Sequence, residues 1–155
     1  MDRLSFLRIS AVLFLSLLLS SACIMDWAPI VVSVTVQDKD GNDRLNPGNA
    51  SSFIGENIAM TYDGKTYRME IPTKVYMPHF SGLELLNQRE GGRWYLRFGE
   101  LDGSQNHNDT FKLKWPDGTQ DVITFHRTIM TPLIVVDTWR LNGKKVDQLP
   151  IVIVK

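Results

Sequence analysis

The sequence contains almost no cysteine, and this shortage limits how the protein can be held together. Cys23 is the one cysteine among 155 residues, so an intramolecular disulfide is impossible. The chain must therefore be stabilised by an apolar core. Removal of residues 1–22 leaves 133 residues (155 minus 22), a length that buries roughly two-thirds of the unfolded surface. We expect one self-supporting domain.

An excess of charge of either sign is also missing. Lys and Arg total 17, and Asp and Glu total 17. Residues 1–22 contain two Arg and one Asp, so 15 basic and 16 acidic residues follow them. Nonspecific nucleic-acid binding needs a concentrated positive face, and we predict no nucleic-acid partner. After residue 23 no stretch approaches the roughly 20 apolar residues of a membrane-spanning helix.

Motifs for catalysis or zinc binding are not evident. The three histidines are His79, His107 and His126, and none has a second His or Cys at the spacing that zinc sites use. No serine lies in a Gly-x-Ser-x-Gly turn, and no glycine-rich phosphate loop is present. Local sequence singles out no pair of carboxylates. We therefore predict that the protein is not an enzyme.

The first 22 residues have the three parts of an export signal. Arg3 and Arg8 supply a basic start, and residues 9–19 (ISAVLFLSLLL) supply an apolar stretch. At about 11 residues this stretch is too short to span a bilayer. The small residues Ser-Ser-Ala at 20–22 then lead to Cys23. We predict a signal peptide over residues 1–22.

The flank before Cys23 resembles the lipobox of bacterial lipoproteins, in which lipid is attached to the cysteine thiol and the signal is cut before it. Ala22 and Ser21 fit the pattern, whereas Ser20 stands where the family usually has Leu, Val or Ile. The same flank also fits an ordinary signal-peptidase site. Lipidation explains why an exported chain has a single thiol. The resemblance implies a lipid such as palmitate on Cys23, and residues 23–29 then form a tether.

The rest of the chain alternates apolar and polar residues in short runs, as half-buried β-strands do. In residues 30–36, Ile30, Val32, Val34 and Val36 share one face. Similar runs predict strands over residues 58–62, 66–71, 93–98, 111–115, 122–125, 133–141, 144–146 and 151–154. Residues 82–89 are the one segment with the character of a short helix.

Turn residues separate these runs. Asp63-Gly64 and Asn142-Gly143 are typical of hairpin turns, because Gly tolerates the positive φ that such turns require, and residues 116–119 (Pro-Asp-Gly-Thr) are another turn. About eight short strands joined in this way predict an all-β domain over residues 30–155. We expect an antiparallel β-sandwich, Ig-like or transthyretin-like in shape, with a small β-barrel as the alternative.

The loop after the first expected strand carries oxygen ligands of the kind that calcium takes. They are Asp38, Asp40, Asn42 and Asp43. The glycine falls at the fourth place instead of the sixth, and Asn49 stands where a closing Glu belongs. We favour a β-turn that uses Asp, Gly and Asn for their backbone tolerance. A calcium site is the alternative.

A basic face with one aromatic residue is a second candidate for binding. Arg93, Tyr95 and Arg97 point outward on one expected strand, and Lys112 and Lys114 point outward on another. If the two strands pair, this face can stack a sugar or hold an anionic glycan. The alternative is a solvated sheet face whose Lys and Arg side chains protect against edge pairing.

Short motifs make the whole chain similar to the small lipoproteins of Bacteroides-type gut bacteria. They are Asp26-Trp27-Ala28-Pro29, the Asp38, Gly41, Asn42 and Asp43 set after Val36, Asn46-Pro47, and Trp115-Pro116-Asp117-Gly118-Thr119 followed by Asp121, Ile123 and Phe125. The resemblance implies a cell-envelope β-sandwich on the outer membrane. Only one acidic residue closely follows Cys23, and this implies a domain that faces the periplasm rather than the cell surface.

Three hypotheses for function follow, in order of preference. The first is a non-catalytic, membrane-anchored envelope lipoprotein that binds an envelope protein or a glycan without a cofactor. The second is a carbohydrate-binding module with calcium at residues 38–43. The third is a small hydrolase.

Overall fold

The computed structural model describes residues 27–54, 57–71, 82–87, 92–131 and 134–155. Cys23, the predicted signal peptide over residues 1–22, His79 and Leu133 lie outside the described residues. Within the described part, ten strands form: β1 (Ile30–Gln37), β2 (Ala59–Tyr62), β3 (Lys65–Glu70), β4 (Leu83–Asn87), β5 (Trp94–Leu101), β6 (His107–Lys114), β7 (Gln120–Thr131), β8 (Ile134–Leu141), β9 (Lys144–Val146) and β10 (Ile151–Val154). The described residues include no helix long and apolar enough to cross a membrane.

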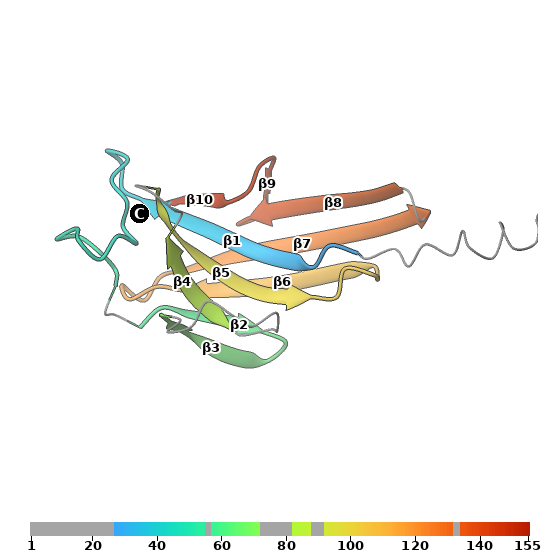
Figure 1. Ribbon diagram of the computed structural model, residues 1–155, viewed down its shortest axis with the longest axis horizontal. Helices are drawn as coiled ribbons and strands as arrows, with labels where there is room; N and C mark the ends of the chain where they lie inside the picture. Colours follow the sequence, from blue (N-terminus) through green and yellow to red (C-terminus); the bar gives the residue numbers. More distant parts are fainter. Residues whose placement is uncertain (1–26, 55–56, 72–81, 88–91, 132–133) are drawn as a thin grey trace, which may run out of the picture.

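A single mixed sheet contains all ten strands, in the order β10-β1-β5-β4-β3-β2-β6-β7-β8-β9. The sheet curves round one core and is nearly closed, so its shape is barrel-like (Figure 1). β3 makes the sheet continuous, because it pairs with β2 on one side and with β4 on the other. The all-β prediction is confirmed, and the arrangement supports the barrel alternative rather than a specific sandwich.

Two strand pairs are parallel, contrary to the purely antiparallel expectation. β3 runs parallel to β4, and β1 runs parallel to β10. A parallel pair needs a crossover of about a dozen residues, and the 12 positions between Glu70 and Leu83 (71 to 82) satisfy that requirement. The pairing of β10 with β1 also shows that the apolar strand at the end of the chain completes the protein's own sheet.

The core consists of the side chains that the alternation placed inward. On β1, Ile30, Val32, Val34 and Val36 are all buried. Phe111, Leu113 and Trp115 on and after β6 are buried in the same way, while Lys112 and Lys114 between them are exposed. Burial of apolar area at roughly 25 cal/mol per Å² makes this cluster the main source of stability.

Tight turns connect the strands where Asp-Gly and Asn-Gly predicted them. Asp63 and Gly64 have φ values of 48° and 71°, and Asn142 and Gly143 have φ values of 50° and 81°. Positive φ at both central residues is the conformation that matches the twist of a two-residue hairpin. The hairpins β2–β3 and β8–β9 are therefore confirmed.

The short helix expected from residues 82–89 is wrong in the part that the structure describes. Leu83–Asn87 is strand β4, and it pairs residue for residue with β5. Leu83 and Leu85 are buried, and Glu84 between them is not. A short apolar run does not by itself distinguish a strand from a helix. In this segment the residues alternate between buried and less buried, as in a strand paired with β5.

Candidate functional site

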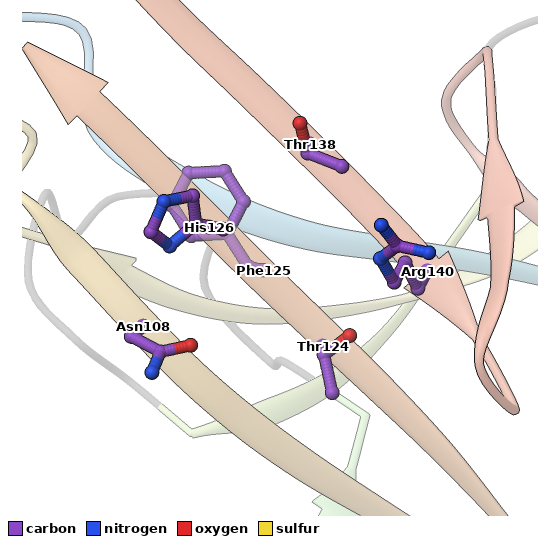
Figure 2. Close-up of a pocket in the computed structure, with 6 residues that line it drawn as sticks. All are labelled: Asn108, Thr124, Phe125, His126, Thr138 and Arg140. Carbon is purple, nitrogen blue, oxygen red and sulfur yellow. The ribbon is translucent and has the colours of Figure 1, made fainter.

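A shallow depression lies on the outer face of the meander β6–β7–β8. Its volume is about 360 Å³, and its lining is Asn108, Thr124, Phe125, His126, Thr138 and Arg140. Figure 2 shows Asn108 on β6, with the other residues on β7 and β8. The ring of Phe125 is buried in the core, so the outer surface of the depression is polar.

The register of the three strands explains why a hollow forms there. Asn108, His126 and Thr138 lie opposite one another in one row across the sheet, and Thr124 lies opposite Arg140 in the next row. Neighbouring strands are about 4.8 Å apart, so these side chains are within contact of one ligand. The two threonines are short and their neighbours are longer, which leaves a hollow above Thr124 and Thr138.

The hydrogen-bonding groups in the depression are largely free for a ligand. The Arg140 guanidinium makes one long hydrogen bond, 3.4 Å from Nη1 to the Gly143 carbonyl oxygen. The His126 Nε2 atom lies 3.0 Å from the Thr128 hydroxyl. None of the described lining residues is a carboxylate or a thiol. The depression therefore presents donors and a positive charge, without an acid–base pair.

Lys112 and Lys114 add positive charge beside this depression. Lys112 pairs across the sheet with Val122, one row from Thr124, so its Cβ lies roughly 7–8 Å diagonally from that threonine. Both lysines are exposed, and no carboxylate among the described residues forms an ion pair with either of them. Of the five residues predicted to bind a ligand, Lys112 thus adjoins the depression, and Lys114 lies one row farther along β6, opposite Gln120.

The other three predicted ligand-binding residues lie elsewhere. Arg93, Tyr95 and Arg97 are on or next to β5, which pairs with β1 and β4 and is separated from β6 by β4, β3 and β2. The pairing of the two strands, which was the condition for one shared basic face, therefore does not occur. Arg97 forms ion pairs with Glu84 and Glu100. Arg93 donates to the Gln37 side chain over 2.5 Å.

The predicted calcium loop folds as a tight turn. Oδ1 of Asp38 accepts hydrogen bonds from the backbone N–H groups of Asp40 and Asn42, at 2.9 and 2.8 Å. The Asn42 side-chain amide donates to Oδ2 at 2.8 Å. The hydrogen bonds from Asn42, followed by the one from Asp40, hold the pKa of Asp38 below its usual value.

Asp43 also uses its carboxylate to accept backbone hydrogen bonds. Its two oxygens accept from the N–H groups of Leu45 and Trp94, each at 2.8 Å. Among the described residues, no three His, Cys, Asp or Glu side chains are grouped so that they could hold a metal ion. The hydrogen bonds of Asp38 and Asp43 are those expected of a β-turn. Calcium binding at Asp38, Asp40, Asn42 and Asp43 stays a prediction.

A polar cluster around His107 was not found from the sequence. His107 Nδ1 lies 2.8 Å from the Asp109 carboxylate, and Nε2 lies 2.5 Å from the Asp102 carbonyl oxygen. The Tyr62 hydroxyl donates to the other Asp109 oxygen at 3.0 Å. Burial, followed by this contact with Asp109, raises the pKa of Tyr62 to about 12.

Both nitrogens of His107 are occupied, so the cluster holds the loop between β5 and β6 in place and leaves no nitrogen for a substrate. The His-x-Asp spacing is the signal that could have revealed it, because residues two apart on a strand share a face. His126 lies apart from this cluster, on the outward side of β7.

A second buried polar cluster closes the other end of the sheet. Asp121 accepts hydrogen bonds from Trp115 Nε1 at 2.6 Å and from the Asn142 amide at 2.7 Å. It also forms an ion pair of 3.0 Å with Lys155. Burial disfavours the charged carboxylate, but the hydrogen bonds from Asn142, Lys155 and Trp115 outweigh it and lower the pKa of Asp121. All of its partners are internal, so this cluster is structural.

Comparison of the chain with protein-family models, with curated proteins and with solved structures gives no match. The functional argument therefore depends on the geometry alone. On the outer face of β6–β8, unpaired basic groups and hydroxyls surround a hollow, with Lys112 beside it and Lys114 one row farther along β6.

Proposed function

We propose that the protein is a non-catalytic binding module, attached to the bacterial outer membrane by lipid on Cys23 and facing the periplasm. The lipobox-like flank before Cys23 supports the anchor. The depression on β6–β8 supports binding rather than turnover, because its described lining offers donors and no acid–base pair. The preferred ligand is an anionic glycan.

The unpaired cations on this face are the observation that carries the choice of ligand. Arg140, Lys112 and Lys114 have no carboxylate partner among the described residues. A guanidinium recognises carboxylate or sulfate through paired hydrogen bonds. Thr124, Thr138 and Asn108 can bond to sugar hydroxyls. A neutral glycan would leave the cations unused, and a protein partner would need a contact area larger than this depression, about 800 Å² on each partner.

The direct test is titration of the purified mature protein with acidic polysaccharides, for example a polyuronate and a sulfated glycan, and with a neutral glucan. We expect binding to the acidic chains, weakened by salt because exposed charges are screened. Arg140→Ala should reduce affinity about tenfold, since one charge-assisted hydrogen bond contributes about 1.5 kcal/mol or more. Lys39→Ala, in an exposed loop away from β6–β8, is the matched control.

Equal affinity of wild type and Arg140→Ala for every acidic polysaccharide would remove this face from the proposal. Location is tested separately by protease treatment of intact cells that carry a tagged copy. Protection until lysis is expected for a domain that faces the periplasm. Digestion in intact cells would place the domain on the cell surface.

A further inference from the structure

The far end of the β7–β8 hairpin exposes a group of large apolar side chains. Met130 is 66% exposed, Ile134 50%, Val136 45% and Val135 37%. These four residues are called the hairpin tip below. In Figure 1 the arrowhead of β7 and the start of β8 extend beyond the neighbouring strand β6. The tip therefore lies outside the core, where exposed apolar side chains are unfavourable unless something covers them.

The chain enters the fold at this same end. The Ala28 carbonyl oxygen lies 2.2 Å from the point that a Cβ on Gly103 would occupy, and Arg127 Nη1 lies 2.7 Å from it. Arg127 donates to the Gly103 carbonyl oxygen at 2.9 Å and forms a two-point ion pair with Asp137 at 2.8 and 2.7 Å. The Ala28 backbone thus lies against Gly103, whose carbonyl oxygen is bonded to the Arg127 side chain of β7 near the base of the tip.

Chain length limits how far Cys23 can lie from this end. Cys23 and Ala28 are five Cα–Cα steps apart in the sequence (28 minus 23), and a fully extended chain spans at most about 3.6 Å per step, so the limit is roughly 18 Å. Met130 is three residues beyond Arg127 on β7, or roughly 10 Å at the strand rise. A lipid on Cys23 therefore holds this end of the protein, and the hairpin tip with it, close to the bilayer.

We infer that the hairpin tip is a membrane-contact site, which enters the surface of the phospholipid bilayer that holds the lipid anchor. The inference rests on the proposed lipidation of Cys23. Interfacial binding grows with the apolar area that the bilayer buries, and the tip presents apolar side chains on both faces of the hairpin. Val135 continues the inward face of β8, and Ile134 and Val136 continue its outward face.

Strand addition by a second protein fits the tip less well. β9 pairs only with Trp139–Leu141, so β8 has a free edge before Trp139 within the described residues. However, Asp137 points inward on that free edge and is paired with Arg127. Inward charges on an edge strand are a known protection against pairing with other chains. At the surface of a bilayer, water and lipid headgroups can hydrogen-bond to the backbone of this edge, while the apolar side chains of both faces enter the interface.

Single-cysteine labelling of the lipidated full chain tests the inference. Lipid on Cys23 blocks the natural thiol, so Val136→Cys gives one site for an environment-sensitive dye. Lys39→Cys, in the exposed loop after the far end of β1, is the control. Each protein is placed in phosphatidylcholine–phosphatidylglycerol vesicles that contain lipids spin-labelled near the top of the acyl chain. Met130→Cys on the neighbouring strand repeats the measurement if Val136→Cys folds poorly.

We expect the dye at position 136 to shift to shorter wavelength and to be quenched about twofold by the spin-labelled lipids, with no change at position 39. Equal, weak quenching at both positions in protein that floats with the vesicles would overturn the inference and leave the anchor standing. Shielding at position 136 that depends on protein concentration and not on the quencher would show that a second copy covers the tip, which also overturns it.

The wild-type protein serves to distinguish failure of lipidation at Cys23 from failure of the hairpin tip to contact the membrane. The lipidated wild type should take up no dye. If it is labelled at Cys23 and does not float with the vesicles, lipidation has failed, and the inference that depends on it is overturned together with that part of the proposed function.

Discussion

Gly103 is a position where a single added methyl group should strongly disturb the structure. A Cβ there would meet the Ala28 carbonyl oxygen at 2.2 Å and Arg127 Nη1 at 2.7 Å, both far inside van der Waals contact. Backbone cannot move aside as the end of a flexible side chain can, so Gly103→Ala must displace either the entering chain or the loop between β5 and β6.

The magnitude follows from the contacts that are lost. Overpacking costs typically 1–3 kcal/mol, and displacement of the Gly103 carbonyl oxygen breaks its 2.9 Å hydrogen bond from the buried Arg127, at a further cost of about 1.5 kcal/mol. We expect Gly103→Ala to lower the free energy of unfolding by about 2.5–4.5 kcal/mol. The melting temperature should fall by roughly 10 °C.

Urea denaturation of the purified mature protein, followed by tryptophan fluorescence, measures this loss. Gly48→Ala is the matched control, because its nearest contact is a side-chain oxygen of Asn46 at 3.3 Å. It should change the free energy of unfolding by less than about 0.5 kcal/mol. Equal stability of Gly103→Ala and Gly48→Ala would refute the packing of Ala28 against Gly103, and with it the placement of the chain entry.

Three further predictions concern charge. Because the pKa of Asp121 is lowered in the folded protein, the ionised carboxylate should stabilise the fold fully above its ordinary pKa, and this stabilisation should be lost as the pH falls below about 3.8. Asp121→Asn should weaken this acid dependence of the free energy of unfolding in denaturation curves. An unchanged acid dependence would contradict the assignment. The pKa of Tyr62 is raised from 10.0 to about 12, so the protonated hydroxyl should contribute to the free energy of unfolding below pH 10, and this contribution should be lost as the pH rises to about 12. Tyr62→Phe should remove this alkaline loss of stability, which denaturation curves between about pH 9 and 12 can measure. If calcium binds the 38–43 loop, millimolar calcium should raise the melting temperature, and Asp38→Ala combined with Asp40→Ala should abolish the rise; no rise with wild type would exclude the site.

Strand positions could be predicted well because alternation reports which face is buried. Val32, Phe111 and Trp115 were assigned inward from period two alone, and all three are buried. The same signal does not report strand direction or neighbours. It therefore missed the parallel pairs, and it left open whether the sheet is a sandwich or a barrel.

The candidate site was only partly predictable for the same reason. Lys112 and Lys114 were identified as outward and basic. Their neighbours across the sheet, however, belong to strands that are far from β6 in the sequence or whose register the sequence does not report. Val122 and Thr61 are opposite Lys112 in the structure, and Arg97 is not near it in the strand order. Arg140 and His126 join the site only through the register of β6, β7 and β8.

The intact mass of the protein extracted from bacterial membranes tests the central claim most directly. The account predicts a chain that begins at Cys23 and carries the added mass of a lipid on its thiol, recovered in the membrane fraction. Cys23→Ala should release the protein from the membrane or leave its signal uncut. A mature chain with a free Cys23 thiol in the soluble fraction would contradict the account.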